Sequence, residues 1–128
     1  MILLDTCVLY WLASDHAKLS APARDALRIH AASLSACAIS AFEVAINHRK
    51  RRVVLPSEPR IFFADLLARY AIDCLPVTWE IAARSVDLPP IHSDPADRLI
   101  VATSQVHSLT IITPDAYIRA YPGVSVLW

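Results

Sequence analysis

Glycine is almost absent from the 128-residue sequence, in which Gly123 is the only one. Phosphate-binding loops of the Walker type and dinucleotide-binding fingerprints need several glycines at fixed offsets, because their backbone must approach a phosphate closely. The sequence therefore excludes both of these classes of nucleotide-binding protein.

Cysteine is also scarce, and the three cysteines, Cys7, Cys37 and Cys74, are too far apart to form a CxxC pair. A zinc ribbon or a thioredoxin-like motif therefore has no support. Each cysteine lies in or beside an apolar segment, which predicts reduced, buried thiols in a cytoplasmic protein.

Long apolar runs are missing, although 55% of the residues are hydrophobic. No segment reaches the length that a membrane span requires. The N-terminal residues lack the basic region of a signal peptide, and Asp5 interrupts their apolar run early. We therefore expect no membrane partner and a single domain over residues 1–128, with the apolar surplus divided between a buried sheet and a partner interface.

Net charge is zero, so no overall field attracts nucleic acid. The basic residues are nevertheless unevenly placed, because the run "HRKRR" at residues 48–52 contains Arg49, Lys50, Arg51 and Arg52. Two interpretations of this run stay open: a solvated helix end and an RNA-binding surface.

Short apolar segments alternate with longer segments that carry helix signals. Strands are expected at residues 1–5, 33–37, 72–77, 109–114 and 124–128. Helices are expected at residues 8–13, 20–32, 40–52, 57–70, 78–88, 94–107 and 115–121. The strands are apolar throughout rather than alternating, which is typical of central parallel strands. The pattern predicts a three-layer α/β/α domain with a central, mainly parallel sheet of four to five short strands.

Acidic residues follow or flank several of these strands. Asp5 ends the first strand, Asp115 follows the strand at 109–114, and Glu43 and Asp97 lie in the first turns of two helices. Sites in parallel sheets form at the carboxyl ends of the strands, so we expect these carboxylates to meet. Such a cluster repels itself unless protons or divalent cations neutralise it, and oxygen ligands favour Mg²⁺ or Mn²⁺ over zinc.

Most of the acids also have a structural interpretation. Glu43 follows Ser40 by three residues, as in a capping box. Asp94 precedes a proline and resembles a helix N-cap, Asp97 would favour the helix dipole, and Asp115 fits a turn. We interpret Asp94 as a cap and Asp97 as part of a metal site.

Asp5 differs from the other acids, because it has no evident capping role and is costly to bury unless it is paired. His92 is interpreted as a loop histidine that satisfies a backbone group rather than as a ligand or base. Trp11, Trp79 and Trp128 are interpreted as core or dimer contacts rather than base-stacking platforms.

Four segments in this order resemble one known family: "LLDTCVLYWL", "LSACAISAFEVAINHRKRRVVLP", "IHSDPADRLIVATSQ" and "LTIITPDAYIRAY". Over essentially its whole length, the chain resembles a PIN-domain ribonuclease of the VapC type, the toxin of a type II toxin–antitoxin system. It departs from the family pattern at Ala96, where an aromatic residue is common, and at Ser108 and in the 48–52 turn, where glycines are common. These departures affect loop shape and touch no proposed ligand.

The resemblance implies a PIN-like fold and a metal-dependent endoribonuclease that uses Mg²⁺ or Mn²⁺ to hydrolyse RNA. It also implies a homodimer and a cognate antitoxin protein that inserts a segment toward the active site. The residues that it implies are an acidic quartet, an auxiliary acid and two supporting hydroxyls: Asp5, Glu43, Asp97 and Asp115, then Asp94, then Thr6 and Thr113.

Two other functions remain as alternatives. A receiver-like phosphoacceptor domain also gathers acids around Mg²⁺, but it needs a lysine near its last strands, and this chain has no lysine after Lys50. A catalytically silent protein that keeps the PIN fold for binding or dimerisation is the second alternative, and the complete acid set argues against it.

Overall fold

The computed structural model describes all 128 residues, from Met1 to Trp128. Its strands are β1 (Ile2–Leu4), β2 (Leu34–Cys37), β3 (Asp73–Leu75), β4 (Thr110–Ile112) and β5 (Val126–Leu127). Its helices are α1 (Thr6–Ser14), the short 3₁₀ helix η1 (His16–Lys18), α2 (Ala21–Ile29), α3 (Ile39–Arg49), α4 (Pro59–Arg69), α5 (Trp79–Asp87), α6 (Pro95–His107) and α7 (Ala116–Arg119). None of the helices is both long enough and apolar enough to cross a membrane.

The five strands form one sheet in the order β3-β2-β1-β4-β5, and every neighbouring pair is parallel. The central strand β1 pairs with both β2 and β4, so that Leu4 aligns with Ala36 on one side and Ile112 on the other. The carboxyl ends of these three strands therefore meet at one edge of the sheet. The predicted parallel sheet is confirmed.

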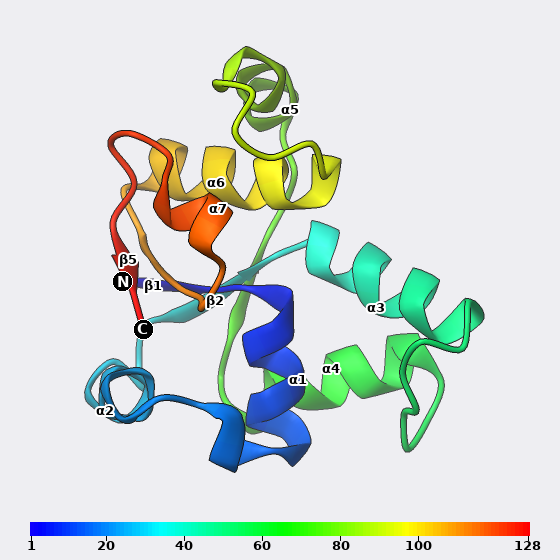
Figure 1. Ribbon diagram of the computed structural model, residues 1–128. Coiled ribbons are helices and arrows are strands. Elements are labelled where there is room, and N and C mark those ends of the chain that lie inside the picture. The colour runs from blue at the N-terminus through cyan, green and yellow to red at the C-terminus, as the bar shows by residue number, and fades with distance from the viewer.

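Helices cover both faces of the sheet, which confirms the predicted three layers. Leu4 of β1 belongs to a core that includes α1, α2 and α4, whereas Leu3 belongs to a second core that includes α5, α6 and α7. Successive strand residues point to opposite faces, so β1 contributes to both cores. In Figure 1, α6 and α7 lie on one side of the strands, and α1, α2 and α4 lie on the other.

The edge strand β3 differs from the prediction that all strands are apolar and buried. Asp73 and Cys74 are exposed, because β3 has a neighbour on one side only. The prediction of a buried thiol is therefore wrong for Cys74, whereas Cys37 is buried and Cys7 is half-buried. The strand also ends at Leu75, before Pro76, which lacks the N–H that a ladder needs.

The helix α3 does not include the whole basic run, so the predicted helix over residues 40–52 is too long at its C-terminal end. The helix ends at Arg49, Lys50 is its C-cap, and Arg51 has a φ of 57°. Ser108, after α6, has a φ of 54°. The resemblance implies glycine at these places, and both residues adopt the left-handed backbone that glycine favours.

The tryptophans occupy two different environments. Trp11 packs on Trp128, with ring centroids 5.6 Å apart. Trp79 is 79% exposed at the start of α5, so it is not a core residue.

Candidate active site

The four predicted acids line one cavity of about 410 Å³ at the carboxyl edge of the sheet. Asp5 directly follows β1, and Asp115 comes three positions after β4, while Glu43 and Asp97 come from α3 and α6. The nine residues that line the cavity are Asp5, Thr6, Cys7, Trp11, Glu43, Asn47, Asp97, Pro114 and Asp115.

Asp5 is only 5% exposed and accepts hydrogen bonds at both carboxylate oxygens. Its Oδ1 accepts from the Thr6 amide at 2.7 Å, and its Oδ2 accepts from Thr113 Oγ1 at 2.6 Å. Asp5 is the N-cap of α1, so the interpretation that it has no capping role is wrong. Burial raises the pKa of Asp5 above its usual range, and the hydrogen bonds from Thr113 and Thr6 oppose that rise only in part.

Glu43 is held by Thr6 and not by a capping box. The helix α3 begins at Ile39 with Ala38 as its N-cap, so Ser40 lies inside the first turn. Thr6 Oγ1 lies 2.9 Å from Ser40 Oγ and donates to Glu43 Oε1 at 2.6 Å. Burial raises the pKa of Glu43, while the Thr6 hydroxyl lowers it.

Asp94 and Asp97 lie at the start of α6 and have different surroundings. Asp94 is the N-cap, and its Oδ1 accepts from the Ala96 amide at 2.9 Å, which confirms the cap prediction. The Asp97 side chain is 14% exposed. Burial, followed by the charges of Asp5, Asp94, Glu43 and Asp115, raises the pKa of Asp97 to about 8.

Asp115 is the N-cap of α7, and its Oδ1 accepts from the amides of Tyr117 and Ile118 at 2.7 and 3.3 Å. Its own amide donates to Thr113 Oγ1 at 3.1 Å. Thr113 therefore contacts both Asp5 and Asp115.

His92 lies closer to the acids than the sequence indicated. The Asp94 amide donates to His92 Nδ1 at 3.2 Å, so the ring does satisfy a backbone group. Its Nε2, however, lies 2.7 Å from Asp97 Oδ2 and 3.6 Å from Asp115 Oδ2. The position of His92, two residues before the "DPADR" segment, was the only available sign of this contact.

Arg98 has an organising role that the sequence did not reveal. Its guanidinium donates to the carbonyls of Ser85 at 3.0 Å and Leu88 at 2.7 Å, where α5 ends. It also donates to the carbonyls of Pro89 at 2.9 Å and His92 at 3.2 Å. A cation suits the carbonyls at a helix C-terminus, so Arg98 fixes the loop that carries His92.

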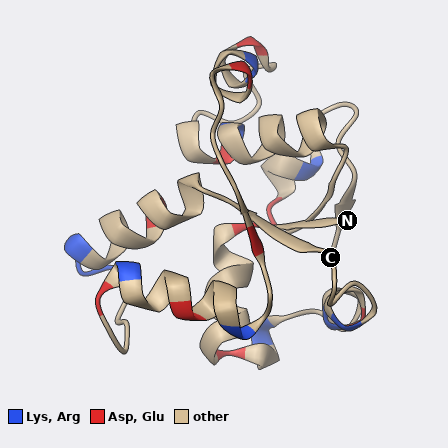
Figure 2. Cartoon of the chain, turned by 180° about the vertical axis from the view of Figure 1, so that it is seen from behind, with Lys and Arg blue, Asp and Glu red and all other residues tan.

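The basic run lies apart from the acids. Arg49, Lys50, Arg51 and Arg52 are exposed, and none of them lines the cavity. Arg49 lies about 9 Å along the axis of α3 from Glu43, given the rise of an α-helix. Figure 2 shows these basic residues at the end of α3 remote from the sheet.

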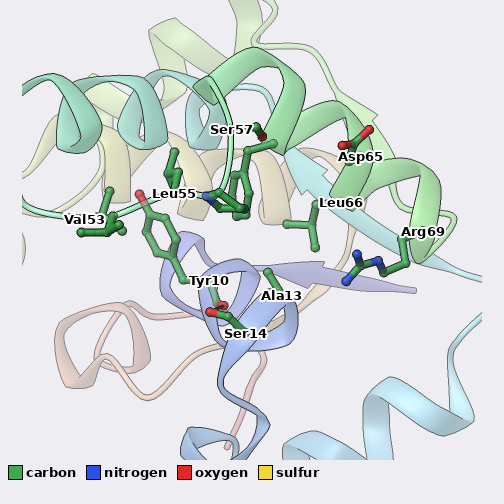
Figure 3. Close-up of a pocket in the computed structure, with 12 residues that line it drawn as sticks. Tyr10, Ala13, Ser14, Val53, Leu55, Ser57, Asp65, Leu66 and Arg69 are labelled. Carbon is green, nitrogen blue, oxygen red and sulfur yellow. Dashed lines mark hydrogen bonds between the residues drawn. The ribbon is translucent and has the colours of Figure 1, made fainter.

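A second cavity, of about 230 Å³, lies between α1, α4 and the loop that joins α3 to α4. Figure 3 shows Tyr10 of α1 beside Val53 and Leu55 of the loop, with Leu66 contributed by α4. Asn47, which lines the acidic cavity, donates to the Tyr10 hydroxyl at 3.3 Å. The two cavities are therefore neighbours on either side of this hydrogen bond.

The donors in and beside the acidic cavity fit a hard divalent cation. The ligand atoms of Glu43, Asp94 and Asp97 lie within 4.8 Å of one another, as do those of His92, Asp97 and Asp115. Carboxylate oxygens dominate both groups, and such ligands suit Mg²⁺ or Mn²⁺. No lysine or arginine lines the cavity, so the receiver-like alternative lacks the lysine that it needs.

Comparison with known proteins agrees with this geometry. Ribonuclease VapC22 of Mycobacterium tuberculosis is 36% identical over 130 residues, covering 99% of this chain and 98% of that protein. The structure of VapBC2 from Rickettsia felis bound to a promoter DNA fragment has a TM-score of 0.71 at 14% identity, covering 98% of this chain and 97% of that one. A toxin–antitoxin complex from Klebsiella pneumoniae has a TM-score of 0.62 at 25% identity, covering 97% and 95%. Because the PIN domain family model also matches residues 2–124, the chain belongs to the PIN-domain family and to its VapC-type members.

Proposed function

We propose that this protein is a Mg²⁺- or Mn²⁺-dependent endoribonuclease and the toxin of a toxin–antitoxin pair. The observation that carries the proposal is the convergence of Asp5, Glu43, Asp97 and Asp115 in one cavity without a neutralising lysine or arginine. The name of the relative that is 36% identical, a ribonuclease, supports the same reaction.

Asp97 has the central place among the proposed metal ligands, because it belongs to both groups of converging donors. Glu43, Asp115 and Asp5 would complete the ligand set, with Asp94 as an auxiliary acid. A bound divalent cation would lower the pKa of a coordinated water and stabilise the oxygen that leaves a phosphodiester.

Two hydroxyls have the proposed role of orienting these acids. Thr6 donates to Glu43, and Thr113 donates to Asp5, each at 2.6 Å. A hydrogen bond to a carboxylate favours its ionised form, and it also fixes the direction of the remaining lone pairs. These threonines therefore prepare the acids to bind a cation and to position an attacking water.

The basic run Arg49–Arg52 is proposed to contact RNA outside the cavity. Its side chains are exposed, and its cations suit backbone phosphates. Because Arg49 lies about 9 Å from Glu43 along α3, such contacts would lie beyond the cleaved bond. The run would then increase affinity for RNA without taking part in hydrolysis.

A cognate antitoxin and a second copy of the chain are the proposed protein partners. The Klebsiella pneumoniae relative was solved as a toxin–antitoxin complex. Here the apolar cavity beside Tyr10 borders the acidic cavity, and Val54 in its lining is 96% exposed. Trp79 and Val86 of α5, 79% and 77% exposed, form a separate apolar surface that suits a homodimer.

Cleavage of total RNA by the antitoxin-free protein tests the proposed activity. We expect discrete products with Mn²⁺, none with EDTA, and none with Asp97→Asn in the presence of Mn²⁺. Asp25→Asn is the matched control, because the Asp25 side chain is 68% exposed and pairs only with Arg28. Equal cleavage by Asp97→Asn and the wild type would contradict the proposed site, and Mn²⁺-independent cleavage would contradict the metal.

A further inference from the structure

His92 is held in place through its backbone as well as its ring. Its amide donates to the Tyr121 hydroxyl at 2.9 Å, and its carbonyl accepts from Arg98 Nη1 at 3.2 Å. The imidazole lies against the ring of Tyr117, with a centroid separation of 5.0 Å. The side chain is 18% exposed. A loop residue with this many restraints presents its ring to the acids in one defined orientation.

The hydrogen bonds also determine which ring nitrogen carries the proton. The Asp94 amide donates to Nδ1, so Nδ1 must provide a lone pair. A neutral imidazole has one protonated nitrogen, which is then Nε2. Nε2 lies 2.7 Å from Asp97 Oδ2 and 3.6 Å from Asp115 Oδ2. His92 therefore presents a donor, and not a lone pair, to Asp97, while Asp115 Oδ2 lies beyond hydrogen-bond distance of the same nitrogen.

We propose, on the basis of the proposed function, that His92 is a positioning residue that holds Asp97 for a divalent cation without binding the cation itself. The Nε2–H group occupies one oxygen of Asp97 and leaves the second oxygen for the cation. Donors of this kind fix the orientation of metal ligands, and their loss costs about 10- to 100-fold in metal affinity or activity.

The alternative is that His92 is itself a ligand, because its ring nitrogen lies within 4.8 Å of the ligand atoms of Asp97 and Asp115. Binding through Nε2 would require the neutral ring to carry its proton on Nδ1. That proton would then face the Asp94 amide, which is also a donor, and the 3.2 Å hydrogen bond would be lost. The geometry of Asp94 and His92 therefore favours positioning over ligation.

Substitutions at His92 test the positioning role through Mn²⁺ affinity, measured by isothermal titration calorimetry. His92→Ala removes the donor, and we expect Mn²⁺ affinity to fall about 10- to 100-fold. His92→Gln restores an N–H donor and should recover most of that loss. His107→Ala is the control, because His107 is an exposed histidine at the end of α6. Wild-type affinity in His92→Ala, or no recovery in His92→Gln, would overturn the proposal.

Nitrogen-15 NMR of the histidine side chains in the wild-type protein distinguishes the positioning role of His92 from ligation. The His92 signals are assigned by their absence from the spectrum of His92→Gln. We expect a protonated Nε2 both in the metal-free protein and at saturating Mg²⁺. Loss of the Nε2 proton on addition of Mg²⁺ would show ligation and would overturn the proposal.

Asp97→Asn distinguishes failure of this inference from failure of the proposed function. If Asp97→Asn abolishes Mn²⁺ binding and RNA cleavage while His92→Ala leaves both unchanged, only the positioning role is wrong. If Asp97→Asn retains both properties, or if the wild type binds no Mn²⁺, the proposed function is wrong and the role of His92 is wrong with it.

Discussion

At the scale of single residues, two threonine hydroxyls donate hydrogen bonds to buried carboxylates that repel each other. Thr113 is fully buried and Thr6 is 5% exposed. Each donates to one acid at 2.6 Å, Thr113 to Asp5 and Thr6 to Glu43. Burial disfavours the ionised acids, and these hydrogen bonds favour them. The hydroxyls therefore limit the cost of gathering the acids before any cation arrives.

Thr113→Val tests this contribution with little change of shape. We expect the free energy of unfolding to fall by about 1–3 kcal/mol, because Asp5 loses a buried hydrogen bond and the Asp115 amide loses its acceptor. Urea denaturation in EDTA measures the change. Thr110→Val, on the same strand, is the control, because its hydroxyl bonds to Ser125 in an exposed setting. Equal stabilities of the two variants would contradict the role of Thr113.

The pKa of Asp97 predicts how the stability of the metal-free protein depends on pH. Its pKa is about 8 in the folded protein, against a usual value of 3.8. Between these values the folded chain holds a proton that the unfolded chain releases. Stability is therefore fully present at low pH and is lost as the pH rises toward 8, in the same direction as the contributions of Asp5 and Glu43.

Urea denaturation in EDTA at about pH 5 and about pH 8 measures this dependence. We expect the wild type to lose stability over this range, and Asp97→Asn to lose less because it has no carboxyl group to titrate there. Asp25→Asn, altered at an exposed acid, should follow the wild type. A wild-type stability that stays constant or rises over the range would show that the assigned pKa is wrong.

At the scale of elements, the start of α6 combines a cap and a cluster of acids. Asp94 Oδ1 accepts from the Ala96 amide at 2.9 Å, while the Asp94 carboxylate also lies near Glu43 and Asp97. The sequence alone left these two roles in competition. In the structure the Asp94 carboxylate lies both at the helix cap and near the other acids. The two locations are compatible because the cap uses only one carboxylate oxygen.

Substitutions at Asp94 separate the two roles. Asp94→Ala removes the cap, and we expect a loss of about 1 kcal/mol in the free energy of unfolding. Asp94→Asn retains a capping oxygen and should preserve stability, but it should weaken Mn²⁺ binding if Asp94 acts as an auxiliary acid. Thermal denaturation and calorimetry measure the two effects. A large loss of stability in Asp94→Asn would contradict the capping assignment.

Patterns confined to one segment predicted much of this arrangement. A buried parallel strand appears in the sequence as a short continuous apolar run. The strands, and the acids that follow them such as Asp5 and Asp115, can therefore be recognised without knowledge of distant contacts. The start of α3 was not predictable in this way. Ser40 and Glu43 have the spacing of a capping box, but both contact Thr6 of α1, which lies more than thirty positions earlier.

Residues whose roles depend on distant groups were missed for the same reason. Arg98 binds carbonyls at the end of α5, and the backbone of His92 is held by hydrogen bonds with Arg98 and Tyr121. No spacing in the sequence reveals these contacts. Ser108 and Arg51 are a different case. Both have a left-handed backbone that their residue types do not favour, so the residue type alone could not predict it.

At the scale of the whole molecule, the proposed cation would link segments that meet only in the folded state. Acids that follow β1 and β4, and acids from α3 and α6, line one cavity. A cation that binds the folded chain and not the unfolded chain stabilises the fold by mass action. Metal binding should therefore be visible as global stability, without any RNA.

Mn²⁺ at about 100 times its dissociation constant should raise the free energy of unfolding by about 2.7 kcal/mol. Thermal or urea denaturation with Mn²⁺ and with EDTA measures the difference. Asp97→Asn should show a much smaller difference, because it alters the acid that both ligand groups share. Identical unfolding of the wild type in Mn²⁺ and in EDTA would contradict a cation site in this cavity.

The central position of β1 has a consequence for the time at which the cavity forms. Asp5 and Thr113 are 108 positions apart, yet their side chains are joined by a 2.6 Å hydrogen bond. A ribosome must make all the residues between β1 and β4 before these two strands can pair. The acids therefore cannot assemble on a nascent chain until β4 and Asp115 have been made. If the protein is the ribonuclease proposed above, each nascent chain is inactive until that point of its synthesis.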